Sequence, residues 1–505
     1  MQWLMKLPLF VLLMGIGAVA MYLPAIHAFA LRDMHEARTF FYGATLFLML
    51  TGMLGIATSN YQPNHAARSQ LLSLMAAFVL LPVMLAIPFN EALRTTTFLN
   101  SYFEMVSSLT TTGATIFDNP ARLPPSLHLW RAMVAWMGGF LMWVTALAIL
   151  APMNLGGFEV TAEDNANQSG ETYTQFIRIA DPSERLLRFT LDLLPVYVGT
   201  TAFLWVVLAL LGDDALTAIC HAMSVISTSG ISPVGGLEQS ASGRFGEILV
   251  FLFLMLAVSR MTFSRDQNAR RFSQLQSDPE IRIAVVLMIT IPLFLFLRHW
   301  IGAYDVQGQQ DSLAALRALW GGMFTVLSFL TTTGFASADW ATARDWSGLG
   351  TPGLILMGLA LLGGGVATTA GGVKLLRVYA LYKHGQREIE RLIHPSSVAR
   401  SGRHGRKIRR QGAYIAWIFF MLFALSVAAI MTLLSLTGLQ FETSMVLTVA
   451  ALSTTGPLAS IAAETPISYA GLTDPAKIIL IGAMVLGRLE TLAIVALLNP
   501  EFWRS

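Results

Sequence analysis

Charged residues are scarce in this sequence of 505 residues: Asp, Glu, Lys and Arg together make up 12%, while 54% of the residues are hydrophobic. A soluble globular chain carries about 25% charged residues, so roughly half of the usual water-facing charge is missing. The mean hydropathy of +0.60 agrees with this deficit. We therefore expect much of the protein surface to face lipid.

Cysteine and clustered histidine are also missing. Cys220 is the single cysteine, which excludes an internal disulfide and a cysteine metal cluster. The nine histidines are scattered, and none joins a second histidine and a carboxylate at the spacing of a catalytic zinc site. No activated nucleophile is recognisable either. The sequence therefore predicts a protein that is not an enzyme.

Apolar runs recur along the whole chain, and a membrane-spanning helix needs about 20 such residues. We count ten spans, at residues 8–28, 40–58, 70–89, 128–152, 189–212, 245–263, 283–300, 350–382, 412–437 and 476–498. This predicts an all-α polytopic membrane protein. The first two runs would form an N-terminal two-helix hairpin, and a cleaved secretory signal is the alternative for the first run.

Basic residues gather in two places. Eleven Lys or Arg residues lie between Lys374 and Arg410, and a second group lies between Arg260 and Arg282, whereas residues 437–475 contain none. Basic loops stay on the cytoplasmic side of a membrane, so we expect both groups in the cytoplasm. Counting back ten spans places the N-terminus in the cytoplasm as well.

Four short segments share one pattern, in which Ser and Thr residues precede a glycine. They read LTTTGA at 109–114, ISTSGI at 226–231, LTTTGF at 330–335 and LSTTGP at 452–457. Each follows a stretch that is too short to cross a membrane, at 101–109, 216–226, 319–330 and 441–452. Full-length apolar runs flank each unit. The chain thus repeats helix, half-helix, loop and helix four times.

The repeats give a division of the chain into five parts. These are residues 1–62 (N-terminal hairpin), 63–155 (repeat 1, loop 110–115), 156–265 (repeat 2, loop 227–232), 266–395 (repeat 3, loop 331–336) and 396–505 (repeat 4, loop 453–458).

Loops of this kind at membrane depth are tolerated only where they line water or lie inside protein. Glycine permits a positive φ at little cost, so successive carbonyls can turn to one side. Four such loops around one axis would form a ring of oxygens that replaces the hydration shell of a cation. One Thr-Thr-Gly alone is an ordinary turn, but four in the same frame favour a single pore.

At these loops the sequence resembles the Trk/Ktr/HKT superfamily of potassium transporters, and in particular the TrkH-like membrane subunits of bacterial Trk uptake systems. Supporting stretches are FEMVSSL at 103–109, HAMS at 221–224, GGGVATTAGGVK at 363–374, RLIHP at 391–395, GRLE at 487–490 and PEFWR at 500–504. The similarity extends from about residue 5 to the C-terminus. The motif at 363–374 is the most specific of them.

The resemblance implies a channel-like pore in the bacterial inner membrane. Its selectivity filter, the one place where a metal ion (potassium) would bind, would consist of Thr111, Thr112, Gly113, Thr228, Ser229, Gly230, Thr332, Thr333, Gly334, Thr454, Thr455 and Gly456. A glycine in all four loops is similar to potassium-selective members, whereas sodium-transporting plant relatives carry a serine in the first. Potassium would be the substrate, with no cofactor.

The resemblance also implies partners. Members of the family pair as homodimers with one pore per subunit, and they dock on a cytosolic nucleotide-binding regulatory ring of the TrkA type. Membrane lipid is the remaining partner, and no nucleic acid is expected.

Residues 363–372, the Gly-rich loop, interrupt the last apolar run of the third repeat. Five glycines in ten positions are costly in a helix, at about 1 kcal/mol each relative to Ala. The family resemblance implies a gate beneath the filter, and close packing of two helices through small residues is the alternative. The predicted gate residues are Gly363, Gly364, Gly365, Thr368, Thr369, Gly371, Gly372, Lys374 and Arg488.

Charges inside the membrane are costly and tend to be functional. Arg488 lies in the last apolar run, where it would hinder a passing cation near the Gly-rich loop, and a structural pair with Glu442 or Glu490 is the alternative. Lys374 is either a second such charge or the start of the basic cytoplasmic end. For Glu104, cation attraction and a role in holding the first loop are equally open.

Two other functions remain open at this point. A secondary transporter with broken helices also uses half-helix ends at mid-membrane, although such folds usually contain two inverted repeats. A sodium-permeable member of the same superfamily is the second alternative.

Overall fold

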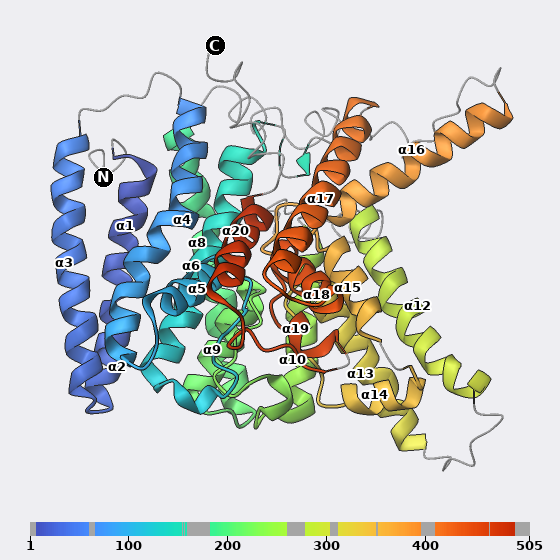
Figure 1. The fold of residues 1–505 in the computed structure, drawn as a ribbon, viewed down its shortest axis with the longest axis horizontal. Coiled ribbons are helices and arrows are strands. Elements are labelled where there is room, and N and C mark those ends of the chain that lie inside the picture. Colours follow the sequence, from blue (N-terminus) through green and yellow to red (C-terminus); the bar gives the residue numbers. More distant parts are fainter. Residues whose placement is uncertain are drawn as a thin grey trace.

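The computed structural model describes residues 7–59, 66–153, 155, 157–158, 182–259, 278–302, 312–349, 352–394, 410–463 and 465–489. Within these ranges the regular structure is entirely helical (Figure 1). Eight of the helices are long and apolar enough to cross a membrane. The predicted all-α polytopic membrane fold is therefore confirmed.

The N-terminal hairpin consists of α1 (Leu9–Ala20), α2 (Tyr22–Ala30) and α3 (Met34–Thr58). Helices α1 and α2 follow one another across a turn at Met21 and together form a single span. The side chain of Asp33 caps α3 by accepting a hydrogen bond from the Glu36 N–H at 3.4 Å. The hairpin packs on α4 at one end of the molecule (Figure 1).

The remaining helices follow the predicted order of long helix, short helix, loop and helix. The first set is α4 (Ala66–Leu93), α5 (Phe98–Leu109) and α6 (Pro125–Thr145), and the second is α8 (Pro182–Leu210), α9 (Ala215–Ser227) and α10 (Gly243–Leu254). The third is α12 (Pro279–Gly302), α13 (Ser312–Leu330), α14 (Trp340–Ser347), α15 (Gly353–Leu362) and α16 (Leu375–Ile393). The fourth is α17 (Arg410–Leu436), α18 (Phe441–Leu452), α19 (Leu458–Ile461) and α20 (Asp474–Leu489).

The four sets pack in a closed ring. In each set the short helix contacts the long helix before it, and the helix after the loop contacts the short helix of the next set. These contacts join α6 to α9, α10 to α13 and α15 to α18, and α20 returns to α5. Neighbours in sequence are thus neighbours around one centre.

Seven of the ten predicted spans coincide with helices of spanning length. The prediction of a full span at 245–263 was wrong, because α10 ends at Leu254 and a 3-10 turn, Met255–Val258, leads into extended backbone at Ser259. The run 350–382 is interrupted at Gly363, as the glycines had indicated. Residues 490–498 of the last span lie outside the described residues.

The short helix of the third set is longer than predicted. Residues 319–330 were expected to be too short to cross a membrane, but α13 begins at Ser312 and meets the length and hydropathy of a span. Helix α14 packs along α13. The sequence signal missed the first turns because residues 312–318 contain Ser312 and Arg317, which lower the local hydropathy.

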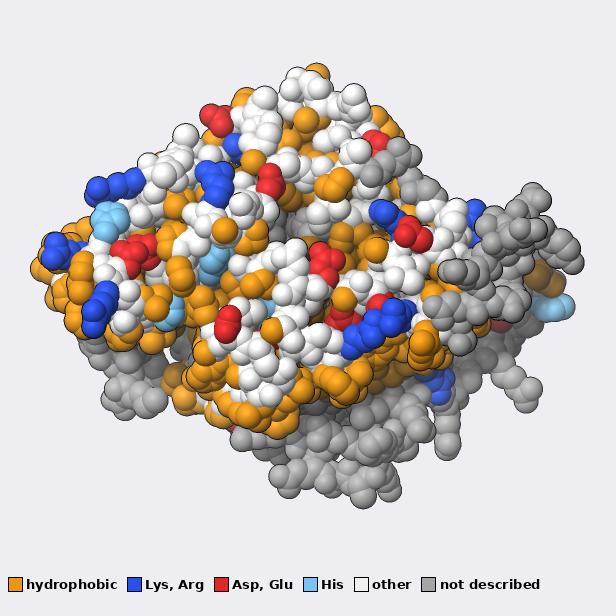
Figure 2. Space-filling model, turned by 90° about the horizontal axis from the view of Figure 1, so that it is seen from below, with side chains coloured by type: hydrophobic (Ala, Val, Ile, Leu, Met, Phe, Trp, Pro, Cys, Tyr) orange, Lys and Arg blue, Asp and Glu red, His pale blue; other side chains and the backbone are white. Residues whose placement is uncertain are grey.

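The face opposite the outer end of α16 carries charged side chains of both signs among polar surface, with hydrophobic side chains along its edge (Figure 2). That distribution fits a water-facing surface bounded by a lipid-facing rim.

Candidate ion pathway

The four predicted filter loops meet at the centre of the ring. A Cβ atom added to Gly113 would lie 1.9 Å from the Ser229 carbonyl oxygen, and one added to Gly230 would lie 2.2 Å from the Thr333 carbonyl oxygen. Only glycine permits these approaches of backbone to backbone. Loop 1 therefore abuts loop 2, and loop 2 abuts loop 3.

The fourth loop closes the ring in a different way. A Cβ atom on Gly334 would lie 3.1 Å from Pro457 of the fourth loop, and the Gly456 N–H donates a hydrogen bond to the Thr112 carbonyl oxygen at 2.6 Å. Gly113, Gly230 and Gly334 have positive φ angles, whereas Gly456 does not. The ring is thus continuous but only approximately fourfold.

The backbone repeats one unusual conformation in all four loops. Thr111, Thr228, Thr332 and Thr454 have φ angles of 54°, 53°, 58° and 54°. A β-branched residue in the left-handed region is strained, and such residues persist only where the surroundings enforce them. All four are buried. Left-handed residues that alternate with right-handed ones turn neighbouring carbonyls toward the same side of the chain.

Side-chain hydroxyls hold each loop in this shape. The hydroxyl three residues before each glycine bonds to the hydroxyl one residue before it, at 2.8 to 3.2 Å. These pairs are Thr110 with Thr112, Ser227 with Ser229, Thr331 with Thr333 and Ser453 with Thr455. These hydroxyl pairs therefore stabilise the conformation of each loop.

Glu104 holds the outer end of the first loop. Its carboxylate accepts hydrogen bonds from the Thr115 hydroxyl and the Ile116 N–H, both at 2.7 Å, and it forms an ion pair with Arg131 of α6 at 2.9 Å. Both side chains are at most 5% exposed. Of the two roles considered for Glu104, the structure favours loop support over cation attraction at the mouth.

Glu247, on α10 of the second repeat, holds the outer end of the third loop. Its carboxylate accepts from the Ser337 hydroxyl at 2.8 Å, the Ala338 N–H at 2.6 Å and the Trp320 indole at 2.9 Å. The residue is buried. It therefore ties the second repeat to the third on the outer side of the ring.

Asp213 supports the second loop region. It accepts hydrogen bonds from the Ser240 hydroxyl at 2.6 Å and the Ser242 N–H at 2.8 Å. Burial alone would raise the pKa of this carboxyl, but His221, whose Nδ1 lies 3.9 Å from it, and the hydrogen bonds from Ser240 and Ser242 outweigh burial and lower the pKa to about 2. His221 also contacts the Ser232 hydroxyl at 2.8 Å, so it has a structural role beside the second loop.

The Gly-rich loop lies beneath the ring and is buried throughout. It begins with Gly363 at φ 71° and is followed by Lys374 at φ 83°, and Ala367 within it also has a positive φ of 54°. Near its start, the Val366 N–H donates to the buried carboxylate of Glu280 at 2.8 Å. Irregular backbone is therefore enclosed by protein at membrane depth, as its polar groups require.

The middle of the Gly-rich loop contacts the filter loops directly. The Gly371 N–H donates to the Thr332 hydroxyl oxygen at 2.7 Å, and the Thr369 hydroxyl donates to the Ile226 carbonyl at 3.2 Å. The structure thus places the predicted gate residues against loops 2 and 3.

Two cationic side chains bind carbonyl groups of the same loop. Arg488 donates from Nη1 to the Thr369 carbonyl oxygen at 2.8 Å, and Lys374 donates to that of Ala370. Both side chains are buried. Arg488 therefore lies beside the Gly-rich loop, as predicted. Its alternative partner Glu490 is outside the described residues. Lys374 is buried against the same loop and is not simply the first residue of the basic cytoplasmic stretch.

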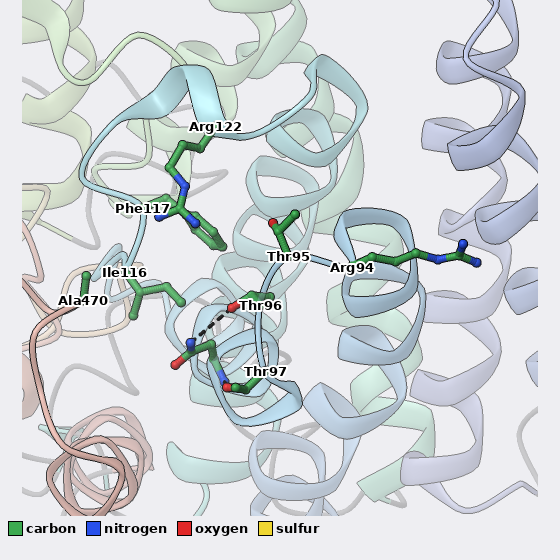
Figure 3. A pocket seen from close by; sticks show the side chains of 9 residues that line it. Arg94, Thr95, Thr96, Thr97, Ile116, Phe117, Arg122 and Ala470 are labelled. Carbon is green, nitrogen blue, oxygen red and sulfur yellow. Dashed lines mark hydrogen bonds between the residues drawn. The ribbon is translucent and has the colours of Figure 1, made fainter.

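A separate cavity of about 450 Å³ opens beside the outer end of the first loop (Figure 3). Thr96 and Thr97 line one side and Phe117 and Arg122 the other, while Arg94 points away from it (Figure 3). Arg122, the arginine that faces the cavity, makes it unlike a cation site. The ring of loops therefore remains the candidate ion pathway.

The supporting residues Arg131, Asp213, Glu247 and Glu280 were not predicted from the sequence. A charged residue within an apolar run was the available signal for Arg131, but only Arg488, Lys374 and Glu104 were considered in this way. Glu247 and the Ser337 hydroxyl that donates to it are 90 residues apart, and Glu280 and Val366 are 86 apart. No local pattern links such pairs.

Comparison with known proteins gives consistent matches along the whole chain. The family model for TrkH, described as a cation transport protein, matches residues 36–236 and 247–504. The Trk system potassium uptake protein TrkH of Salmonella typhimurium is 30% identical over 414 residues, covering 81% of this chain and 80% of the relative. TrkH of Escherichia coli K12 is 28% identical and covers 96% of each chain.

A solved structure shows the same fold. The crystal structure of the potassium transporter TrkH from Vibrio parahaemolyticus superposes with a TM-score of 0.84 over the full length of both chains, at 24% identity.

Proposed function

Because this chain belongs to the TrkH family of cation transport proteins, which are membrane transporters and not enzymes, we propose that it takes up potassium through one pore in the membrane. The relatives are Trk system potassium uptake proteins. The observation that carries the proposal is the closed ring of four loops with the same left-handed threonine in each.

The ring is proposed as the selectivity filter. Its members are the residues from the left-handed threonine to the glycine in each loop: Thr111, Thr112, Gly113, Thr228, Ser229, Gly230, Thr332, Thr333, Gly334, Thr454, Thr455 and Gly456. Helices α5, α9, α13 and α18 end at or next to the loops, so the negative ends of their dipoles favour a cation there. Oxygens of carbonyl groups would replace the hydration shell of potassium.

Glycine in the first loop supports selectivity for potassium. Gly113 faces the Ser229 carbonyl so closely that any side chain would displace the ring. A displaced ring would fit a dehydrated potassium ion less well, and sodium permeability would rise.

The Gly-rich loop is proposed as the gate. It touches the ring from one side, and the charges of Arg488 and Lys374 on its carbonyls oppose a cation in the same place. The Arg488 and Lys374 side chains already bind carbonyl oxygens, and carbonyl oxygens are the ligands that potassium would use. Conduction then requires the loop to move.

Location and partners are further parts of the proposal. Helix α1 begins on the same side of the molecule as the outer end of α16 (Figure 1), which supports a cytoplasmic N-terminus if the basic end of α16 is cytoplasmic. We propose a bacterial inner membrane protein that pairs as a homodimer and binds a cytosolic regulatory ring of the TrkA type. The domain boundaries remain a prediction.

Rubidium uptake into proteoliposomes tests the function. The purified chain should carry rubidium and potassium down their gradients, and sodium much less, without a sodium or pH gradient. Uptake that needs such a gradient would instead favour a coupled secondary transporter. Equal uptake of sodium would favour a sodium-permeable member of the family.

A further inference from the structure

The contact between the Gly-rich loop and the ring lies at a group of oxygen atoms. A Cβ atom added to Gly371 would lie 2.2 Å from the Thr454 hydroxyl oxygen and 2.4 Å from the Ser453 carbonyl oxygen. On its other side, the Gly371 N–H donates to the Thr332 hydroxyl oxygen at 2.7 Å. Gly371 is thus packed between two hydroxyls and one carbonyl of adjacent loops.

These oxygens are the ligand type that a dehydrated monovalent cation takes. The Thr454 hydroxyl is fully buried and has no hydrogen-bond partner among the residues that the structure describes. The equivalent hydroxyl of Thr111 is also fully buried and also has no hydrogen-bond partner among the described residues. Burying an unpaired hydroxyl is costly, and a bound cation would remove that cost.

We infer that Gly371 and the innermost transported cation compete for this one place, so that potassium arriving in the filter drives the gate open. The inference rests on the proposed function and adds a means of regulation by the transported ion. Two physical effects exclude simultaneous occupancy. The glycine backbone fills the space against Thr454 and Ser453, and its N–H directs a partial positive charge at the oxygen that the cation needs.

The symmetry of the ring makes the competition testable. Thr332 and Thr111 occupy the same position of loops 3 and 1, with the same φ within a few degrees and the same burial. The hydroxyl of Thr332 accepts the bond from Gly371, whereas that of Thr111 has no partner among the described residues. Thr→Val keeps the branched shape at both positions and removes the oxygen ligand.

The experiment is single-channel recording of the full chain in planar bilayers, at low and high potassium with ionic strength held by an impermeant cation. The wild-type open fraction should rise with potassium. Thr332→Val should raise the ratio of open to closed time by about threefold to tenfold, the usual effect of one hydrogen bond, and should weaken its dependence on potassium. Thr111→Val should lower the unit conductance without this shift.

Thr332→Ser retains the hydroxyl and should restore gating like that of the wild type. Equal open fractions for Thr332→Val and Thr111→Val, or a wild-type open fraction independent of potassium, would overturn the competition while potassium conduction stands. A folded wild-type chain that passes no potassium would overturn the proposed function itself. Size-exclusion profiles of each variant establish folding, and Gly371→Ala, which must push the loop off the ring, gives a second route to the open state.

Discussion

The loops on the outer side of the ring and the Gly-rich loop beneath it are both irregular, but they differ in exposure and in the bonds that join them to their surroundings. Asp118 and Ala338 of the outer loops are exposed, whereas the Gly-rich loop is buried throughout. Glu104 and Glu247 each accept hydrogen bonds from two donors of an outer loop through a buried carboxylate.

The Gly-rich loop also binds charged side chains, those of Glu280, Arg488 and Lys374. Its contacts with the ring itself, at Thr369 and Gly371, are neutral hydrogen bonds. Neutral bonds contribute about 0.5–1.5 kcal/mol each, and those to charged groups about twice that. The weaker, neutral contacts suit the proposal that the Gly-rich loop moves while the ring stays fixed.

The largest effect should come from breaking an outer support. Glu104→Ala leaves Arg131 buried without its carboxylate partner, so we expect a destabilisation of about 3–5 kcal/mol, measured by unfolding in detergent. The double variant Glu104→Ala/Arg131→Met should recover much of the loss. Glu91→Ala, which removes the exposed ion pair with Arg94, is the control and should change little. If the two single variants behave alike, the outer loops are not held as described.

A change within the ring should alter selectivity more than stability. Gly113→Ser adds a side chain at φ 72°, against the Ser229 carbonyl. We expect the permeability ratio of potassium to sodium to fall by about tenfold, or about 1.4 kcal/mol. Reversal potentials under bi-ionic conditions measure it. Gly358→Ser on α15, where an added Cβ meets nothing within 4 Å, is the matched control. Unchanged reversal potentials would contradict the filter assignment.

Weakening the gate should have a smaller effect in the opposite direction. Arg488→Ala removes both a positive charge and the bond to the Thr369 carbonyl, so rubidium uptake should rise severalfold, while Arg344→Ala on the exposed face of α14 should leave it unchanged. A variant that elutes normally by size exclusion yet transports at the wild-type rate would show that Arg488 does not restrain the gate.

The smallest expected effect is on the stability of the fold and its dependence on pH. Because the folded protein lowers the pKa of Asp213 to about 2 from 3.8, the carboxylate stabilises the fold at all pH values above 3.8, and this contribution disappears as the pH falls through about 2. Asp213→Asn should therefore lower the unfolding temperature by about 2 °C at pH 7. The gap between variant and wild type should narrow below pH 3.8. A gap that is constant with pH would show that charge plays no part.

The sequence was sufficient to predict the ring and its position in the chain. Four copies of one short pattern in the same frame of apolar runs implied four loops around one axis, and the glycine contacts from Gly113 to Ser229 and from Gly456 back to loop 1 show that the loops do meet. The break at Gly363 was also evident, since glycine is costly inside a helix.

What the sequence could not supply was the set of contacts between distant residues. The early end of α10 at Leu254 has no glycine or proline to mark it. The bond from Gly371 to Thr332 spans 39 residues, and its existence depends on how two irregular segments pack. Hydropathy and periodicity describe elements one at a time, so they do not predict which buried donor binds which buried acceptor.

The bond from Gly456 to the Thr112 carbonyl has a consequence for biosynthesis. In a tetrameric assembly four finished subunits could meet at once, but here the first loop must wait until about 340 further residues have been translated, about 20–70 s at ordinary ribosome speeds. During that interval the first three sets of helices would be in the membrane while the side of α5 and of the first loop that the fourth set covers is still exposed. The insertion machinery, or a lipid lodged against α5, would have to shield the exposed main chain until α18 and α20 arrive.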